Sequence, residues 1–90
     1  RAVSSWRIET SIDFDRSLSK LDTSVARKIV AYLEEVVTLE DPRQRGKGLT
    51  AERRGYWRYR IGDYRVIAKI DHGRLVVIAL DAVHRSRAYG

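Results

Sequence analysis

The sequence has 90 residues, of which 43% are hydrophobic and 33% are charged, a composition typical of one small globular domain rather than of a disordered chain. It contains no cysteine and only two histidines, which excludes disulfides, thiol nucleophiles and zinc–thiolate sites and disfavours a histidine-rich metal site. No segment is long and apolar enough to span a membrane, and no secretory signal pattern opens the chain. We therefore expect a single cytoplasmic domain over residues 1–90 that uses no metal or cofactor and binds no membrane.

Positive charge is concentrated in the second half of the chain. The net charge is +6, and residues 42–90 hold 12 basic and 4 acidic side chains, against 6 basic and 8 acidic in residues 1–41. Fourteen of the 18 basic residues are arginines, whose planar guanidinium groups bind phosphate through paired hydrogen bonds, whereas lysine is a point charge. The second half therefore indicates a surface that binds a polyanion, although a solvated basic surface would have the same composition.

The first part of the chain predicts a short strand and two helices. Residues 6–9 alternate as in a strand, and Phe14, Leu18 and Leu21 share one face of a helix. Residues 22–24 offer N-caps for a second helix. The apolar stripe of this second helix comprises Val25, Ile29, Leu33, Val36 and Val37. It should span residues 23–39 and end before Pro42, because the residue that precedes a proline disfavours helical backbone. The short connection predicts an antiparallel helical hairpin.

The second part predicts a basic connecting loop and three strands. The loop covers residues 43–48, and the strands cover residues 57–61, 64–70 and 75–80. The last strand is almost continuously apolar, as in the interior of a sheet. Gly62 and Asp63 suit a two-residue hairpin turn. Asp63 is therefore better explained by the turn than by catalysis.

A two-residue turn fixes the register of the first hairpin, pairing Ile61 with Tyr64 and Arg60 with Arg65. One face then carries the side chains expected to pack on the helices, namely Trp57, Tyr59, Ile61, Tyr64, Val66, Ala68 and Ile70. The other face carries Arg58, Arg60, Arg65 and Lys69. Like charges opposite each other in a sheet are destabilising. We therefore expect an anion on this second face, the alternative being guanidinium groups that spread into water or meet carboxylates elsewhere.

Motifs along nearly the whole chain resemble one family. They are Lys20-Leu21-Asp22, Asp41-Pro42-Arg43, Gly46-Lys47-Gly48-Leu49, the run YWRYRIGDYRVI over residues 56–67, and Val83-His84-Arg85 followed by Tyr89. This pattern resembles the RelE-type toxins of the RelE/ParE toxin–antitoxin superfamily. The resemblance implies an α+β fold in which an N-terminal helical hairpin packs on a mostly antiparallel four-stranded sheet, as in small microbial ribonucleases. It also implies a metal-independent endoribonuclease that cleaves mRNA in the ribosomal A site and so inhibits translation.

The resemblance also assigns a site. Carried over by position, the catalytic residues are Arg58, Arg60, Arg65, His84, Arg85 and Tyr89. The other basic residues that we expect to bind RNA are Arg45, Lys47, Arg53, Arg54, Lys69 and Arg87. Some relatives carry lysines where this chain has its first two arginines, so a proton-transfer role at those positions is in doubt, because arginine keeps its proton near neutral pH.

Cleavage of RNA without a metal needs a base for the 2′-hydroxyl, an acid for the leaving 5′-oxygen, and cations for the charge that builds on the phosphate. Arg58, Arg60 and Arg65 can supply the cations. His84 and Tyr89 are the candidates for proton transfer. The alternatives are that His84 caps the last strand and that Tyr89 packs near the chain end, and His72 is expected to be solvated in a turn.

Two other functions remain open at this stage. A ParE-like toxin would have the same fold but inhibit DNA gyrase and cleave no RNA, and a binding module would use the basic face electrostatically. For the toxins we expect a cognate antitoxin as partner, an acidic chain that is partly disordered when free and folds on binding. Messenger RNA and the ribosome are the other expected partners.

Overall fold

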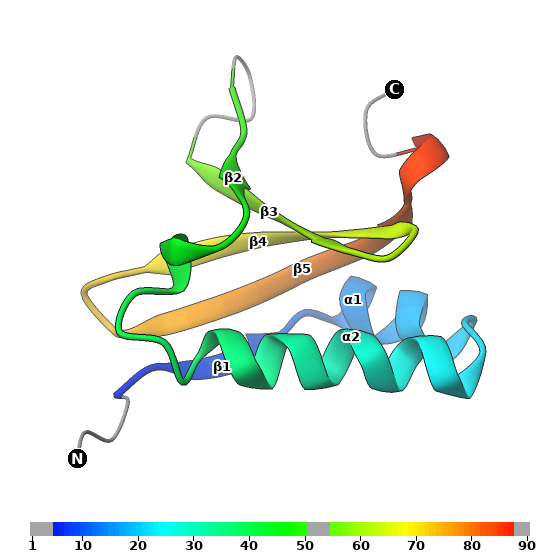
Figure 1. Cartoon of the computed structure of the whole chain (residues 1–90), viewed down its shortest axis with the longest axis horizontal. Coiled ribbons are helices and arrows are strands. Elements are labelled where there is room, and N and C mark those ends of the chain that lie inside the picture. Colours follow the sequence, from blue (N-terminus) through cyan, green and yellow to red (C-terminus); the bar gives the residue numbers. More distant parts are fainter. Residues whose placement is uncertain (1–4, 51–54, 88–90) are drawn as a thin grey trace.

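The segments in which apolar residues alternate belong to one five-stranded sheet. The computed structural model describes residues 5–50 and 55–87, and the strands are β1 (Arg7–Thr10), β2 (Lys47–Gly48), β3 (Tyr56–Ile61), β4 (Tyr64–Asp71) and β5 (Val76–His84). Their order in the sheet is β1-β5-β4-β3-β2, with β1 parallel to β5 and the other neighbours antiparallel (Figure 1). The predicted α+β class, with a mostly antiparallel sheet, is confirmed.

The expected number of strands was wrong by one. Residues 47 and 48 form β2, where the sequence predicts a loop, and they pair with Arg58 and Trp57 of β3. A strand of two residues has no alternation to detect. It begins after Gly46, whose φ of +80° suits glycine and whose missing Cβ leaves room for the backbone of β3. Just after β2, the backbone N–H of Leu49 donates a hydrogen bond to the carbonyl of Tyr56 in β3 (2.9 Å).

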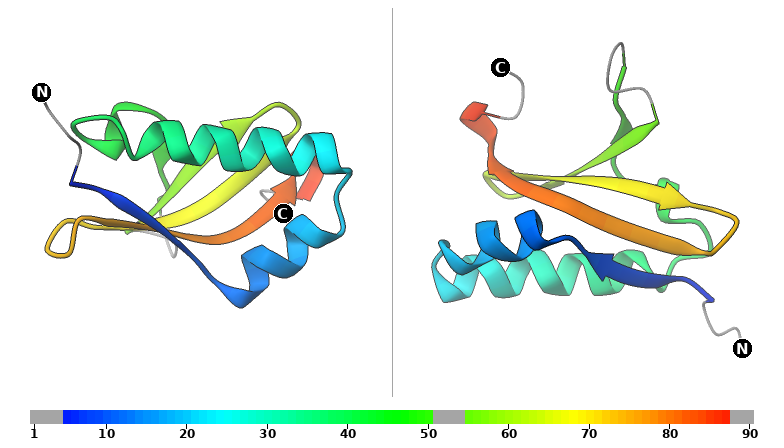
Figure 2. Two further views of the ribbon diagram at one scale, coloured as in Figure 1. Left: turned by 90° about the horizontal axis from the view of Figure 1, so that it is seen from below. Right: turned by 180° about the vertical axis from the view of Figure 1, so that it is seen from behind.

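Both helices lie on the same face of the sheet (Figure 2). They are α1 (Ile12–Ser19) and α2 (Thr23–Val36). The hydroxyl of Ser11 caps α1 by accepting from the backbone N–H of Phe14 (3.0 Å). The second helix ends three residues before the predicted boundary, with Val37 as its C-cap. No helix of the described residues has the length and hydropathy that crossing a bilayer requires.

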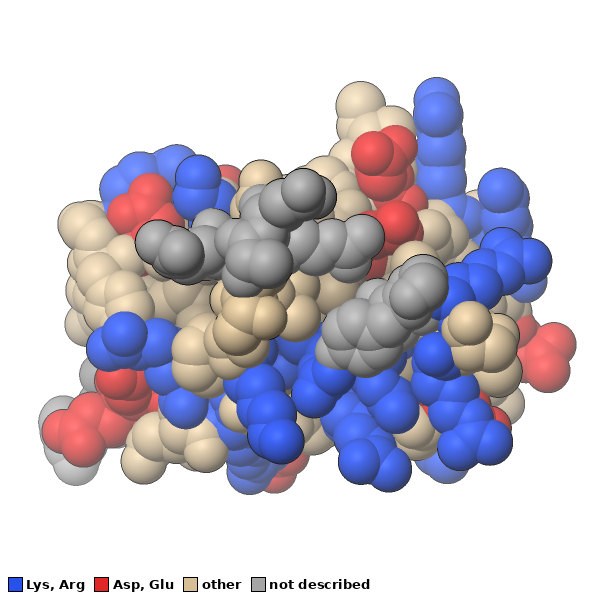
Figure 3. All heavy atoms as spheres, turned by 90° about the horizontal axis from the view of Figure 1, so that it is seen from above, with Lys and Arg blue, Asp and Glu red and all other residues tan. Residues whose placement is uncertain are grey.

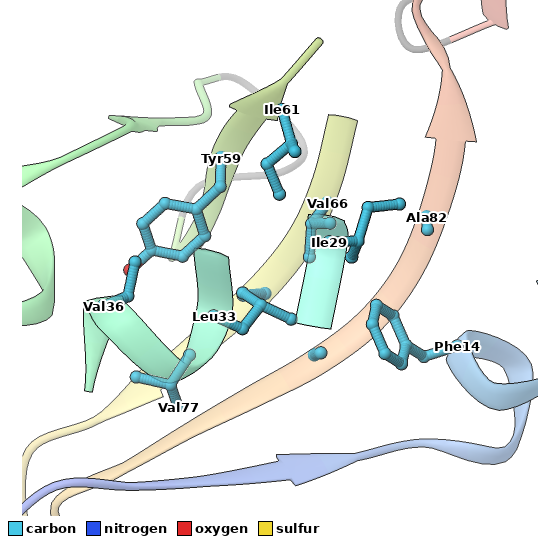
Figure 4. Close-up of a cluster of buried hydrophobic side chains, with 11 residues drawn as sticks. Phe14, Ile29, Leu33, Val36, Tyr59, Ile61, Val66, Val77 and Ala82 are labelled. Atoms are coloured by element: carbon cyan, nitrogen blue, oxygen red, sulfur yellow. The ribbon is translucent and has the colours of Figure 1, made fainter. Parts of the chain in front are cut away.

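The core lies between the helices and the sheet (Figure 4). Its buried members are Phe14, Ile29, Leu33, Val36, Tyr59, Ile61, Val66, Ala68, Val77, Ala79 and Ala82. Tyr59 is fully buried, and its hydroxyl donates to the carbonyl of Pro42 (2.8 Å). Pro42 begins a short 3₁₀ helix, η1 (Pro42–Gln44). This bond therefore ties the connection after α2 to the centre of β3.

The last strand is longer than predicted and contains a bulge. Strand β5 continues to His84, whereas the apolar run predicts an end at residue 80. Opposite β4, Ala79 pairs with Ala68 and Asp81 pairs with Ile67, so that Leu80 is an extra residue. Before the bulge, the side chains of β5 that face the helices belong to odd-numbered residues. After the bulge, they belong to even-numbered residues. The bulge decides on which face of the sheet each of the last residues of β5 lies.

Candidate nucleic-acid interface

Two arginines face each other on the exposed sheet face, close to the turn between β3 and β4. The turn at residues 62 and 63 pairs Arg60 of β3 directly with Arg65 of β4, as the sequence predicts. The helix-facing residues Tyr59 and Val66 form the next pair. Side chains alternate along a strand, so both guanidinium groups project from the face opposite the helices.

Hydrogen bonds to backbone carbonyls of the neighbouring turn hold the guanidinium group of Arg65 in place. Its Nη1 donates to the backbone carbonyls of Gly62 (3.3 Å) and Tyr64 (3.1 Å). Partial burial of this guanidinium lowers its pKa, and repulsion from Arg60, Arg58 and Arg85 lowers it further. These three side chains are therefore close enough to act on Arg65. We name Arg58, Arg60, Arg65 and Arg85 the arginine cluster.

Arg60 and Arg65 receive little compensation from carboxylates of the described residues. Across residues 5–50 and 55–87, neither Arg60 nor Arg65 has a carboxylate oxygen within 4.0 Å. Asp63 approaches Arg85, with 3.8 Å between Oδ1 and Nε, but both side chains are more than 60% exposed. Exposed ion pairs of this kind contribute about 0–1 kcal/mol. The arrangement is destabilising for the protein alone and favourable for a bound phosphate.

Arg85 reaches the cluster because of the chain's path after β5. Its backbone N–H donates to the carbonyl of Asp63 (2.7 Å), which joins the start of the 3₁₀ helix η3 (Arg85–Arg87) to the turn between β3 and β4. The sequence predicts Arg85 in the site, and this bond is the local reason that it lies there.

Two lysines extend the positive charge along the sheet. Lys47 of β2 pairs with Arg58, and Lys69 of β4 pairs with Tyr56 of β3. Both lysines are exposed. We name the arginine cluster together with Lys47 and Lys69 the basic face. The space-filling view of the side opposite the helices shows blue Lys and Arg side chains gathered across its lower half (Figure 3).

Tyr56 is an aromatic residue of the exposed sheet face for which the sequence predicts no role. This residue is 38% exposed, and it is the one aromatic side chain among the large hydrophobic residues that the described part of the chain exposes. It lies two and four residues before Arg58 and Arg60, so the three side chains project from the same face of β3. The same alternation that identifies the arginines places this ring beside them.

His84 lies on the other face of the sheet. It pairs with Tyr64, and the two rings pack edge to face with centroids 5.4 Å apart. Its Nδ1 accepts from the backbone N–H of Ser86 (3.2 Å) and lies 2.9 Å from the Ser86 hydroxyl. The structure therefore does not bring His84 together with Arg60 and Arg65, because the bulge in β5 turns the even-numbered residues toward the helices.

Two other predicted RNA-binding residues lie apart from the basic face. Arg45 is half-buried and donates to Glu35 of α2 (2.8 Å), a bond that raises the pKa of Arg45, and its guanidinium lies 5.5 Å from the ring centroid of Tyr32. These contacts fix η1 against α2. Arg87 is exposed in η3 and lines a pocket with His84 and Lys20.

The remaining predicted positions, Arg53, Arg54 and Tyr89, lie outside the described residues. The described residues contain no group of three or more histidine, aspartate or glutamate side chains arranged to hold a metal ion.

A family model settles the relationship. The model described as "ParE toxin of type II toxin-antitoxin system, parDE" matches residues 8–89. The chain belongs to the ParE toxin family. The predicted membership of the RelE/ParE superfamily is thereby confirmed, whereas the family match does not distinguish between the activities found within that superfamily.

Solved structures of RelE toxins resemble this ParE-family toxin. A chain of the toxin–antitoxin complex RelBE2 from Mycobacterium tuberculosis is 26% identical with a TM-score of 0.83, and the match covers 96% of this chain and 97% of that one. The archaeal RelE–RelB complex from Pyrococcus horikoshii matches at 24% identity and a TM-score of 0.72 (92% and 98% covered). The isolated E. coli RelE toxin matches at 18% identity and a TM-score of 0.73 (94% and 89% covered). A search of curated protein sequences gives no match.

Proposed function

We propose that this toxin is a metal-independent endoribonuclease that cleaves mRNA at the ribosome and so inhibits translation. The observation that supports this proposal most directly is the pairing of Arg60 with Arg65, joined by Arg58 and Arg85. Arg58, Arg60 and Arg85 repel the guanidinium of Arg65 in the free protein, so the cluster favours an anionic partner. A phosphodiester that gains negative charge as it is cleaved offsets this repulsion, and that stabilisation is greatest in the transition state.

The reaction that fits these groups is internal transfer. The 2′-oxygen of one nucleotide attacks the adjacent phosphorus and loses its proton to a base, while the bond to the 5′-oxygen of the next nucleotide breaks and that oxygen gains a proton. The products are a 2′,3′-cyclic phosphate and a 5′-hydroxyl. The arginine cluster holds the non-bridging oxygens, which carry the extra charge in the transition state. Because arginine keeps its proton, other groups move the two protons.

We propose Tyr89 as the proton-transfer residue in preference to His84. The edge-to-face contact of His84 with Tyr64, on the helix side of the sheet, argues against His84. A tyrosine requires a lowered pKa to act as a base at neutral pH, and nearby arginines would lower it. Tyr89→Phe should then reduce cleavage strongly, whereas His84→Ala should leave most of it. The reverse result would assign the role to His84.

The proposal is tested by mapping mRNA cleavage in a reconstituted translation reaction. Arg60→Ala and Arg65→Ala should each lower the cleavage rate by about 100- to 1,000-fold, the usual cost of one oxyanion-stabilising group. Arg27→Ala is the matched control, since it removes one exposed arginine from α2 on the opposite side of the sheet and should cleave like the parent. Circular dichroism checks that each variant folds. Full activity in both folded cluster variants would reject the proposal.

The family match supports a second candidate, inhibition of DNA gyrase, because the model that matches residues 8–89 is that of ParE toxins. A supercoiling assay with purified gyrase separates the two functions. A ribonuclease leaves supercoiling unaffected and cuts translated mRNA. A gyrase inhibitor blocks supercoiling and leaves the RNA intact, which would replace the first proposal.

We also propose that the toxin binds a cognate antitoxin in the cytoplasm. The support is that its structural relatives from M. tuberculosis and P. horikoshii are components of toxin–antitoxin complexes. An acidic antitoxin segment would neutralise the basic face, which has few carboxylates of its own. Co-expression with the protein encoded beside the toxin gene should relieve growth inhibition and yield a stable complex. Failure to relieve the inhibition would exclude that protein as the antitoxin.

A further inference from the structure

The exposed ring of Tyr56 is the feature of the basic face that charge does not explain. Exposing part of an aromatic side chain gives up burial that the fold could use. Tyr56 pairs with Lys69 across β3 and β4 and precedes Arg58 on the same face. The other two exposed large hydrophobic residues of the described chain, Ile12 and Val30, lie on the helices.

The geometry points to Tyr56 as a platform on which one base of a single-stranded RNA stacks while the arginine cluster holds the adjoining phosphates. This inference rests on the proposed ribonuclease function and deepens it by specifying the conformation of the substrate. Proteins that bind single strands combine cationic grooves with aromatic rings, because every base has a face on which to stack. A duplex keeps its bases stacked inside and offers none to this ring.

The spacing along β3 defines the register of the RNA. Side chains two residues apart on one face of a strand are separated by about 6.7 Å. This is about twice the ~3.4 Å rise per nucleotide of a stacked strand. A base on Tyr56 therefore belongs to a nucleotide one or two positions from the phosphate at Arg58. The ring marks one end of the site and the pair Arg60–Arg65 marks the cleavage position.

The role of Tyr56 differs physically from that of the cations, and this difference can be measured. Losing a stacking ring should weaken binding by about 5- to 150-fold. It should not change the slope of log Kobs against log salt concentration, because no phosphate contact is lost. Losing a cation that contacts a phosphate should reduce that slope by about 0.7. A purely electrostatic surface would show only the second behaviour.

The experiment measures binding of a fluorescently labelled, single-stranded 2′-O-methyl RNA, which the proposed reaction cannot cleave. Tyr56→Ala should weaken binding by about 5- to 150-fold, and the slope of log Kobs against log salt concentration should stay unchanged. Tyr56→Phe keeps the ring and should bind like the parent. Val30→Ala is the matched control, since it shortens an equally exposed apolar side chain (40%) on α2 and should have no effect. Lys69→Ala should reduce the slope.

Single abasic substitutions in the RNA then identify the stacked base. At one position the abasic RNA should bind the parent and Tyr56→Ala equally, whereas at the other positions the difference between the two proteins should persist. Unchanged affinity in Tyr56→Ala would overturn the inference, as would a difference that no abasic position removes. Loss of antitoxin or gyrase binding with intact RNA binding would assign the ring to a protein partner instead and also overturn it.

The proposed function and this inference fail in distinguishable ways. If the folded Arg60→Ala and Arg65→Ala variants cleave like the parent but Tyr56→Ala binds RNA weakly, only the ribonuclease assignment fails. If those arginine variants lose cleavage but Tyr56→Ala binds and cleaves normally, only the stacking inference fails.

Discussion

Replacing Arg60 with glutamine should make the protein more stable and less active. Arg60 is exposed and lies directly opposite Arg65, so the substitution removes a like-charge pair while keeping most of the side-chain length. Opposed like charges in a sheet cost about 0.2–1 kcal/mol. For a domain of this size, 1 kcal/mol corresponds to about 4–8 °C in Tm. Arg60→Gln should therefore raise Tm by about 1–8 °C at low ionic strength, measured by thermal unfolding.

Three controls isolate the repulsion. Arg60→Lys keeps the charge and should give no increase. In a protein that already carries Arg65→Gln, the substitution Arg60→Gln should raise Tm by less than it does in the parent, because the opposing charge is already absent. At about 1 M salt, where the Debye length is about 3 Å, the increase should largely disappear. A variant that is no more stable than the parent at low salt, or equally stabilised at every salt concentration, would refute the reasoning.

Three further predictions concern the segment between α2 and β3. Tyr59→Phe should lower the free energy of unfolding by about 1–3 kcal/mol in urea titrations, since it leaves the buried carbonyl of Pro42 without its donor. Gly46→Ala should destabilise by more than about 1 kcal/mol in the same assay, because φ is +80° and the new Cβ would clash with the backbone carbonyl oxygen of Arg58 in β3. Hydrogen bonds from the backbone and side chain of Arg43 lower the pKa of Asp41. The contribution of Asp41 to the free energy of unfolding is therefore complete above the pKa of an aspartate in the unfolded chain, about 3.9. It is lost as the pH falls through the lower pKa of Asp41 in the folded protein. Asp41→Asn should flatten that part of the stability profile measured between neutral pH and about pH 2.

Each of these has an outcome that would contradict it. Gly62→Ala serves as the control for Gly46, since its φ is also positive (+58°) but no atom lies within 4 Å of the added Cβ. If the two substitutions lower the free energy of unfolding equally, the close contact of Gly46 with β3 is unimportant for stability. An unchanged urea midpoint in Tyr59→Phe, or an acid profile of Asp41→Asn that matches the parent, would show that the corresponding bond does not stabilise the fold.

The parts of the structure that depend on local periodicity could be predicted from the sequence. The apolar stripe from Val25 to Val36 defines α2, and the two-residue turn at Gly62 fixes which residues of β3 and β4 oppose each other. The opposition of Arg60 and Arg65 follows from that turn alone. The arginine-rich centre of the candidate site was thus predictable before the fold was known.

The remaining features depend on contacts between distant segments. Strand β2 pairs with β3 across an intervening segment, and two residues carry no periodic signal. The bulge at Leu80 arises where β5 meets β4, and it sets the face of His84 four residues later. A one-residue change of register moves every following side chain to the opposite face. The face of His84 could therefore not be predicted from the sequence, although that of Arg60 and Arg65 could.

The position of β5 has a consequence for how a cell makes this protein. This strand is the last of the five in sequence, yet it lies between β1 and β4 and supplies Val77, Ala79 and Ala82 to the core. Without it the helices lose part of the surface on which they bury their apolar stripes, and β1 has no neighbour. A nascent chain therefore cannot complete this fold before β5, and with it residue 84, has been synthesised.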